Sequence, residues 1–238
     1  MVNVTGVLLA AGGGRRMGRP KALMRSADGR PWLTTAVQAL RDGGCRSVVV
    51  VLGAGADEAR ALLEDSVADF PGDRATASAA VAGGTVAGGT AGREATTRAA
   101  SGVRIVEASD WASGMGASLR TGLASLVEPA SGERNEPGSD PARTPADAAL
   151  IHLVDLPDVG PDVVARLMNH AAAGVLARAD YGHGPAHPVL IGREHWPGVI
   201  ASASGDRGAR DYLRSRDVLA VDCADLATGR DIDTPEDL

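Results

Sequence analysis

The amino-acid sequence predicts an α/β protein, a single domain whose mainly parallel sheet is covered by helices on both faces. Short apolar segments alternate along the chain with segments that repeat apolar residues at helical spacing. The apolar segments are hydrophobic almost throughout, as in parallel strands that are buried on both faces. With 238 residues, 44% of them hydrophobic, the chain has a usual length for one such domain.

The individual elements follow from these two patterns. Short apolar runs predict strands at Val4–Ala10, Ser47–Leu52, Val103–Glu107, Ala148–Val154, Pro188–Ile191 and Val218–Val221. Helical spacing predicts helices at Pro31–Arg41, Asp57–Val67, Gly116–Leu126 and from Asp162 to about Ala173. Strands that alternate with helices favour crossover connections between parallel neighbours.

Two segments lack the apolar residues that a packed element needs. Pro71–Gly102 contains no Leu, Ile, Met or aromatic residue, and Glu128–Asp147 contains no aliphatic residue larger than alanine. Neither segment can offset its ordering entropy by burying apolar surface. We therefore predict one domain over residues 1–238, with disordered or mobile surface insertions at 71–102 and 128–147.

Composition and charge exclude several classes of protein. The net charge of −6 argues against nucleic acid as a partner, because that partner needs a concentrated basic face. No apolar run approaches the roughly 20 residues that span a bilayer, and the first residues lack a signal-peptide pattern. Cys45 and Cys223 are expected to be buried thiols. We expect a cytoplasmic protein without a membrane partner.

The stretch Leu8–Leu23, LLAAGGGRRMGRPKAL, combines a strand end, a glycine-rich loop and several cations. Bare backbone amides and basic side chains in one loop indicate a cradle for polyphosphate. Two common glycine motifs do not fit, because a dinucleotide-binding GxGxxG would need glycine at Met17. A P-loop that starts at Gly13 reaches Gly18 but then meets Arg19 and Pro20 instead of lysine and serine or threonine.

Lys21 is the one lysine among 24 basic residues, and it lies at the end of this loop. The alternative interpretation is a glycine turn with solvated arginines, in a chain that has arginines throughout. An ammonium group is a compact point charge that an arginine fork does not replace. The retained lysine therefore favours a functional role.

Acidic residues lie in two further places. Asp155 follows the predicted strand Ala148–Val154 directly, and ligands bind outside the carboxyl ends of strands in open α/β sheets. In the C-terminal DIDTPEDL, alternation around Ile232 sends Asp231 and Asp233 to the same side. Carboxylates suit Mg²⁺, which also takes phosphate oxygens. A helix start capped by Thr234 is the alternative interpretation of the C-terminal motif.

The glycine-rich stretch resembles the signature loop LAAGxGxRMGxPK of nucleotidyltransferases that have a Rossmann-like GT-A fold. In that family the loop wraps a nucleoside triphosphate, and its arginine and lysine contact the phosphates. The resemblance implies these phosphate contacts for Arg16 and Lys21. It also implies nucleotide contacts for the small residues Ala10, Ala11, Gly12 and Gly14.

Further motifs are similar to those of the molybdenum cofactor cytidylyltransferase branch of the MobA-like nucleotidyltransferases. They are WASGMGASL, LVDLPDV, HPVLI, GDRGAR and DIDTPEDL. The resemblance implies Mg²⁺ binding by Asp155 with Asp231 and then Asp233. It also implies nucleotide contacts by Gly116 and Ser118, and acceptor contacts by His187, Pro188, Asp206 and Arg207. Many cytidylyltransferases carry serine where Gly14 stands, which is a departure from their pattern.

The expected reaction moves CMP from CTP, favoured over GTP, to the terminal phosphate of molybdopterin, with Arg16, Lys21 and Asp155 as catalytic residues. A guanylyltransferase or sugar-phosphate nucleotidyltransferase of the same fold is one alternative. A molybdopterin-binding carrier or chaperone without turnover is the alternative of another class. The expected partners are the molybdopterin-type acceptor and a molybdenum hydroxylase apo-enzyme.

Histidines contribute less to this hypothesis. His152 lies inside an apolar strand, and we expect a core histidine with a satisfied hydrogen bond. His183 and His187 have a spacing that zinc sites use, but no cysteine or third ligand lies near them in the sequence. A zinc site is therefore the minor interpretation.

Overall fold

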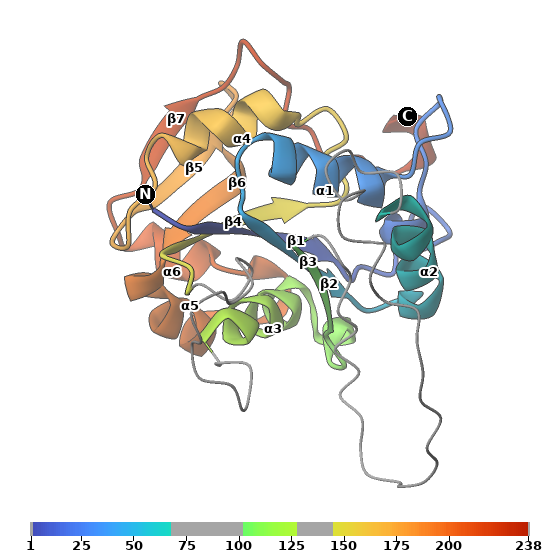
Figure 1. The fold of residues 1–238 in the computed structure, drawn as a ribbon, viewed down its shortest axis with the longest axis horizontal. Helices are drawn as coiled ribbons and strands as arrows, with labels where there is room; N and C mark the ends of the chain where they lie inside the picture. Colours follow the sequence, from blue (N-terminus) through green and yellow to red (C-terminus); the bar gives the residue numbers. More distant parts are fainter. Residues whose placement is uncertain (1, 68–101, 128–144, 238) are drawn as a thin grey trace, which may run out of the picture.

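The computed structural model describes residues 2–67, 102–127 and 145–237 (Figure 1). Most of the two predicted insertions, 71–101 and 128–144, lies outside the described residues. The end of the second one is tied to the fold: Asn3 donates its backbone N–H to Asp147 Oδ2 at 3.0 Å, and Asp147 N–H donates to the Asn3 carbonyl at 2.7 Å.

The described residues form one seven-stranded sheet in the order β3-β2-β1-β4-β6-β5-β7. The strands are β1 (Val4–Ala10), β2 (Ser47–Leu52), β3 (Val103–Glu107), β4 (Ala148–Leu153), β5 (Leu176–Asp180), β6 (Pro185–Gly192) and β7 (Leu219–Asp222). The helices are α1 (Trp32–Asp42), α2 (Ala56–Val67), α3 (Met115–Val127), α4 (Pro161–Met168), α5 (Trp196–Ser202) and α6 (Arg210–Arg214).

Most neighbouring strands are parallel, as the sequence predicts. β3, β2, β1 and β4 run in one direction. β6 is antiparallel to both β4 and β5, and β5 pairs with β7 in parallel. The reversed strand lies directly beside β4, so it borders the loop that carries Asp155.

Two apolar cores lie on opposite faces of the sheet. Leu8 and Leu150 point into the core that α1 and α4 cover, whereas Val7 and Ile151 point into the core beneath α3 and α5. Figure 1 shows these helix groups on either side of the strands. Alternation along each central strand therefore supplies both cores, which explains why β1, β2 and β4 are apolar over most of their length.

The sequence interpretation was wrong or incomplete in the second half of the chain. The helix expected to reach Ala173 ends at Met168. Neither β5 nor the short helices α5 and α6 was expected. β5 has the sequence LARAD, in which two of five residues are charged, and α6 has only five residues. Such short elements carry too little periodicity to predict.

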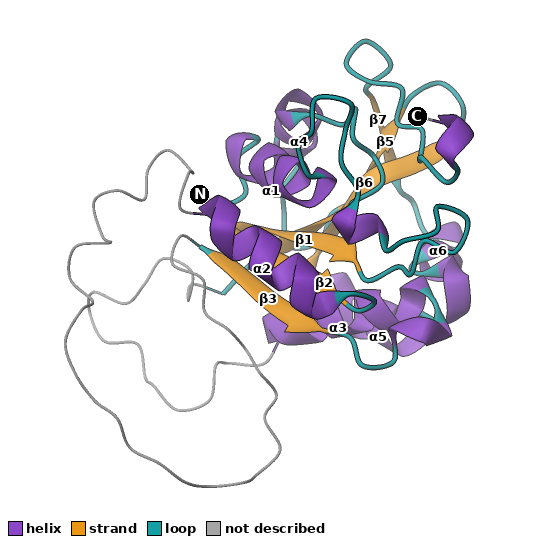
Figure 2. Ribbon diagram, turned by 90° about the vertical axis from the view of Figure 1, so that its right-hand side faces the viewer, coloured by secondary structure: helices purple, strands orange, loops and turns teal. Residues whose placement is uncertain are grey.

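The loops that follow β1, β2, β3 and β4 emerge at one edge of the sheet, because these strands are parallel. Figure 2 shows the arrowheads of β1 and β3 directed away from the N-terminus, with loops beyond them. Cys45 and Cys223 are both buried and unpaired, as predicted. Among the described residues, no helix has the length and apolar character that crossing a membrane requires.

Candidate functional site

The glycine-rich loop after β1 folds back on itself. Lys21 donates its backbone N–H toward the Gly12 carbonyl at 3.4 Å. Gly14 has a φ of +57°, and a Cβ added there would lie 1.9 Å from the Arg19 carbonyl oxygen. Glycine is therefore required at this position, because the two arms of the loop touch through bare backbone.

Two neighbouring loops support the glycine-rich loop. Ala54 donates its backbone N–H to the Ala11 carbonyl at 3.1 Å. A Cβ on Gly53 would lie 2.6 Å from Trp111 Cγ, and one on Gly13 would lie 3.2 Å from Trp111 Cζ3. Trp111, which follows β3, thus packs against the loops after β1 and β2. Its place in the sequence motif WASGMGASL gave the only signal of this role.

An ion cluster joins three segments that are far apart in the sequence. Lys21 Nζ lies 2.5 Å from Asp155 Oδ2 and 2.6 Å from Asp233 Oδ1. Arg16 Nη2 lies 2.6 Å from Asp233 Oδ2. The Lys21 and Asp155 side chains are only 14% and 15% exposed, whereas Arg16 is 68% exposed. The lysine ammonium is thus held between two carboxylates at the carboxyl edge of the sheet.

The contacts in this cluster favour the charged forms of Lys21 and Asp233. Burial alone lowers the pKa of Lys21, but the charges and hydrogen bonds of Asp155 and Asp233 outweigh burial, so the pKa is raised. The hydrogen bond from Lys21 is the main cause that lowers the pKa of Asp233. Around neutral pH the cluster holds an ammonium and a carboxylate in contact.

The C-terminal segment reaches the cluster through its backbone. Ile232 donates its N–H to the Asp155 carbonyl at 3.0 Å, which places Asp231 and Asp233 on either side of this contact. Asp233 enters the cluster, while Asp231 is exposed and lies outside it. The motif ends in a 3₁₀ helix at Pro235–Asp237.

The two carboxylates in the cluster fit a divalent cation. They already converge on one cation, the Lys21 ammonium, and Mg²⁺ in nucleotide sites takes one or two carboxylates plus phosphate oxygens. Within residues 2–67, 102–127 and 145–237, no group of three or more His, Cys, Asp or Glu side chains is assembled for a metal. Asp155 and Asp233 are the carboxylates that the structure brings together, and metal binding by Asp155, Asp231 and Asp233 stays a prediction.

Comparison with known proteins identifies the family. The family described as the MobA-like NTP transferase domain matches residues 6–95 and 75–221. The chain belongs to this family. A curated relative, a nicotine blue oxidoreductase from Paenarthrobacter nicotinovorans, is 33% identical over 99% of this chain and 94% of its own length.

Solved structures share the fold. The chain is similar to Rv0371c from Mycobacterium tuberculosis, at 24% identity and a TM-score of 0.63, over 99% of this chain and 95% of that one. It is also similar to a CTP:phosphocholine cytidylyltransferase from Streptococcus pneumoniae, at 13% identity and a TM-score of 0.56, over 99% of this chain and 96% of that one. At these identities the likeness shows the fold alone.

The two nucleotide contacts predicted on α3 are buried within the MobA-like domain. Gly116 packs against the backbone of Ser204, where an added Cβ would come within 2.6 Å of the Ser204 nitrogen. Ser118 is 5% exposed. The same end of α3 touches the 3₁₀ helix Gly205–Arg207, since a Cβ on Gly114 would lie 2.6 Å from Asp206 Oδ1. The nucleotide roles of Gly116 and Ser118 stay predictions.

The predicted acceptor residues lie on two elements. His187 and Pro188 are on β6, where His187 Nδ1 lies 3.4 Å from the Ile151 carbonyl. Burial lowers the pKa of His187, and Asp155 and Asp231 oppose that shift, so both aspartates are within electrostatic reach of the ring. Arg210 at the start of α6 lowers the same pKa further. Sequence reasoning missed Arg210, although it ends the quoted motif GDRGAR.

The other two predicted acceptor residues are exposed. Asp206 and Arg207 lie in the 3₁₀ helix Gly205–Arg207, and Arg207 pairs with Asp211 at 3.1 Å. The structure therefore does not bring Arg207 into the ion cluster of Lys21, Asp155 and Asp233. Its proposed acceptor contact stays a prediction.

The structure corrects the prediction for His152. The side chain is fully buried, but neither ring nitrogen has a hydrogen-bond partner. Burial, together with the charge of His187, lowers the pKa of His152 to about 3. In the sheet His152 lies beside Leu8, whose side chain offers no polar atom. His183, in contrast, bonds to the Thr228 carbonyl at 2.7 Å.

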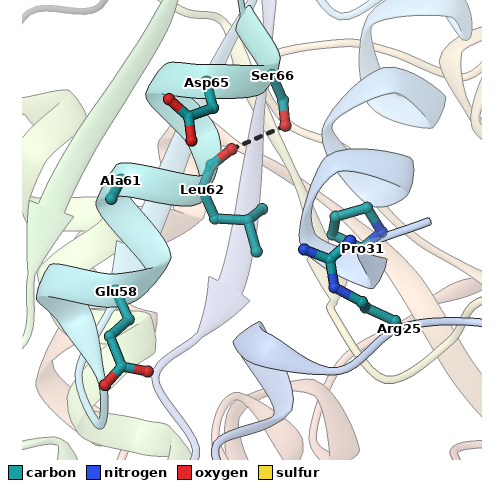
Figure 3. Close-up of a pocket in the computed structure, with 7 residues that line it drawn as sticks. All are labelled: Arg25, Pro31, Glu58, Ala61, Leu62, Asp65 and Ser66. Carbon is teal, nitrogen blue, oxygen red and sulfur yellow. Dashed lines mark hydrogen bonds between the residues drawn. The ribbon is translucent and has the colours of Figure 1, made fainter. Parts of the chain in front are cut away.

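The two described pockets lie away from the ion cluster. One, of 490 Å³, lies between α2 and the segment from Arg25 to Pro31, and Figure 3 shows its lining residues. The other, of 680 Å³, lies between α1 and the loop from Pro157 to Pro161. Neither is lined by Lys21, Asp155 or Asp233, so both are separate from the ion cluster.

Proposed function

We propose that the chain is a Mg²⁺-dependent nucleotidyltransferase that moves CMP from CTP to the terminal phosphate of molybdopterin and releases pyrophosphate. The observation that carries this proposal is the contact of Lys21 with both Asp155 and Asp233. It joins the three sequence motifs that resemble those of molybdenum cofactor cytidylyltransferases. A molybdenum hydroxylase apo-enzyme as the recipient of the product is part of the same proposal.

The reaction needs positioning and charge neutralisation more than proton transfer. A terminal phosphate oxygen of the acceptor forms a bond to the α-phosphorus of CTP. The bond between that phosphorus and the oxygen that bridges to the β-phosphate breaks, and pyrophosphate leaves with the electron pair. The acceptor phosphate is already ionised at pH 7, so no general base is required. Catalysis then rests on alignment and on stabilising charge.

The chain's own residues supply these functions. Lys21 and Arg16 lie at the end and in the middle of the glycine-rich loop, where they neutralise the triphosphate and the leaving group. Asp155, with Asp233 or Asp231, would hold a divalent cation that adds further charge neutralisation when bound. The manganese complex of the similar Rv0371c supports a metal site in this fold.

Pyrophosphate release tests the proposal directly. Purified protein is supplied with Mg²⁺, molybdopterin and either CTP or GTP, and pyrophosphate is measured. We expect release with CTP that exceeds release with GTP, and its loss in Lys21→Ala and Asp155→Ala. Arg166→Ala is the matched control, because Arg166 also makes a 2.5 Å ion pair, with Asp225, outside the cluster. GTP preference would indicate a guanylyltransferase, and binding without release would indicate a carrier.

An oxidoreductase is the second candidate function. The nicotine blue oxidoreductase matches this chain along 99% of its length, at 33% identity. The glycine-rich loop lacks the dinucleotide-binding GxGxxG motif, so a reduced nicotinamide dinucleotide would have to bind through the loop's bare backbone amides and cations instead. Bleaching of nicotine blue with consumption of reduced nicotinamide, in the absence of Mg²⁺, would favour this candidate. Insensitivity of that bleaching to Asp155→Ala would separate it from nucleotidyl transfer.

A further inference from the structure

Asp158 holds the turn that precedes the C-terminal acidic motif. One of its oxygens, Oδ2, accepts three hydrogen bonds: from Thr228 N–H at 2.7 Å, from Thr228 Oγ1 at 2.6 Å and from Gly229 N–H at 3.2 Å. Asp158 lies only three residues after Asp155, in the same loop after β4. The loop after β4 therefore accepts hydrogen bonds from the C-terminal segment at two places, the 228–229 turn and Ile232.

The turn at Thr228 and Gly229 packs closely against the Tyr181 ring. Gly229 has a φ of +61°, and a Cβ added there would lie 2.0 Å from Tyr181 Cε2. Tyr181 in turn donates its hydroxyl to the His187 carbonyl at 2.9 Å. The 228–229 turn is therefore clamped between the Asp158 carboxylate and the Tyr181 ring, and only glycine fits at its second position.

The segment from Thr228 to Thr234 has no regular secondary structure of its own. No strand ladder fixes its register, so its position depends on point contacts with other elements. Those near its start are the three bonds to Asp158 and the His183 contact with the Thr228 carbonyl. Asp231 and Asp233 follow three and five residues after Thr228.

We propose that Asp158 is a positioning residue that sets the place of Asp231 and Asp233 relative to Asp155. This inference rests on the proposed function where it links these carboxylates to a metal. Asp158 does not touch the ion cluster; it acts through the backbone of the 228–233 segment. Without the Asp158 carboxylate, the N–H groups of Thr228 and Gly229 and the Thr228 hydroxyl hydrogen-bond to water instead. The 228–233 segment then loses the contacts that hold its start in place.

Hydrogen exchange of the Ile232 amide is the deciding measurement, because that N–H bonds to the Asp155 carbonyl whatever the reaction is. We expect Asp158→Ala to speed this exchange about tenfold. Asp158→Asn restores slow exchange, because all three bonds end on one oxygen, which an amide oxygen can replace. Asp162→Ala is the matched control: it removes the same charge four residues further on, at a carboxylate that makes no side-chain hydrogen bond or ion pair with the described residues.

Manganese alone serves as the probe for the metal link. We expect Asp158→Ala to weaken Mn²⁺ binding about tenfold, in the range of changes that outer-shell partners cause, while Asp158→Asn and Asp162→Ala stay within about twofold. If Asp158→Ala does not fold, Thr228→Val removes one of the three donors and tests the same contact.

The two proposals fail separately. Wild-type protein that releases no pyrophosphate with any nucleotide overturns the proposed function, but the Ile232 exchange still decides the role of Asp158. Equal exchange in Asp158→Ala and Asp162→Ala overturns the positioning role even in an active enzyme. Faster exchange that Asp158→Asn does not reverse also overturns it, because the acceptor oxygen would then not be what holds the turn.

Discussion

Lys21 and His152 are both largely buried near the end of β4, but their pKa values shift in opposite directions. Lys21 is 14% exposed and has two carboxylates within 2.6 Å, so it stays charged and its pKa is raised. His152 is fully buried with no hydrogen-bond partner, and its pKa falls to about 3. Burial acts in the same direction on both groups, and partners decide the outcome. A paired cation is available for chemistry, whereas the unpaired imidazole is a neutral part of the core.

Removing the paired cation has the largest expected effect. Lys21→Met leaves Asp155 and Asp233 facing each other without the ammonium between them. We expect pyrophosphate release to fall by about 10²–10³-fold, the usual loss when a preorganised charge-stabilising group is removed. The measurement is initial rate at saturating nucleotide, with folding checked by thermal unfolding.

Lys21→Arg sharpens this prediction. The variant keeps the positive charge, but a planar guanidinium cannot replace a compact ammonium between two carboxylates. We expect its rate to lie between those of Lys21→Met and the wild type. Full activity in Lys21→Arg would mean that charge alone matters and that the solitary lysine carries no special role.

The unpaired histidine predicts a pH-dependent stability. Because the folded pKa of His152 lies below the unfolded value of about 6.5, the unfolded chain binds more protons between these values. Stability is therefore fully present above about pH 6.5 and is lost as the pH falls toward 3. At pH 5 this loss amounts to about 2 kcal/mol.

His152→Leu tests that loss through urea unfolding at pH 7 and pH 5. We expect the difference in unfolding free energy between the two pH values to shrink by about 2 kcal/mol. Part of the pH dependence remains, because burial also lowers the pKa of His187. An unchanged difference would show that His152 finds a partner in solution.

At pH 7 the same substitution should be nearly neutral. His152 makes no hydrogen bond to lose, and replacing an unpaired buried polar group by an apolar one of similar size costs little. We expect a change within about 1 kcal/mol in the free energy of unfolding. A larger loss at pH 7, measured by the same urea titration, would contradict the absence of a partner.

The contrast also shows what sequence reasoning can reach. Lys21, Asp155 and the C-terminal aspartates were predicted because each ends a strand or lies in an ordered motif, and parallel strands bring such ends to one edge. The first four strands were predicted from their short runs of mainly apolar residues, which are most continuous in β2 and weakest in β3. The prediction for His152 was wrong because its hydrogen-bond partner would have to come from a neighbouring element of the fold. The residues next to His152 in the sequence do not show whether such a partner is present.

The remaining misses have the same physical origin. Asp158 acts on Thr228, seventy residues away, through bonds that only the folded chain defines. β5 depends on pairing with β6 and β7 more than on its own residues, of which Arg178 and Asp180 are charged. These features therefore depend on contacts between segments that are far apart in the sequence, and local sequence patterns do not predict such contacts.

The smallest expected effect comes from the exposed member of the ion cluster. Arg16 contacts Asp233 at 2.6 Å, as Lys21 does, but it is 68% exposed, so solvent screens the pair and folding gains little from it. We expect Arg16→Ala to change the free energy of unfolding by no more than about 0.5 kcal/mol, while the KM for the nucleotide rises. Urea unfolding and nucleotide titration measure the two effects. An equal loss of unfolding free energy in Arg16→Ala and Lys21→Met would contradict this prediction. It would mean that the exposure of a cation does not decide how much its ion pair with Asp233 stabilises the fold.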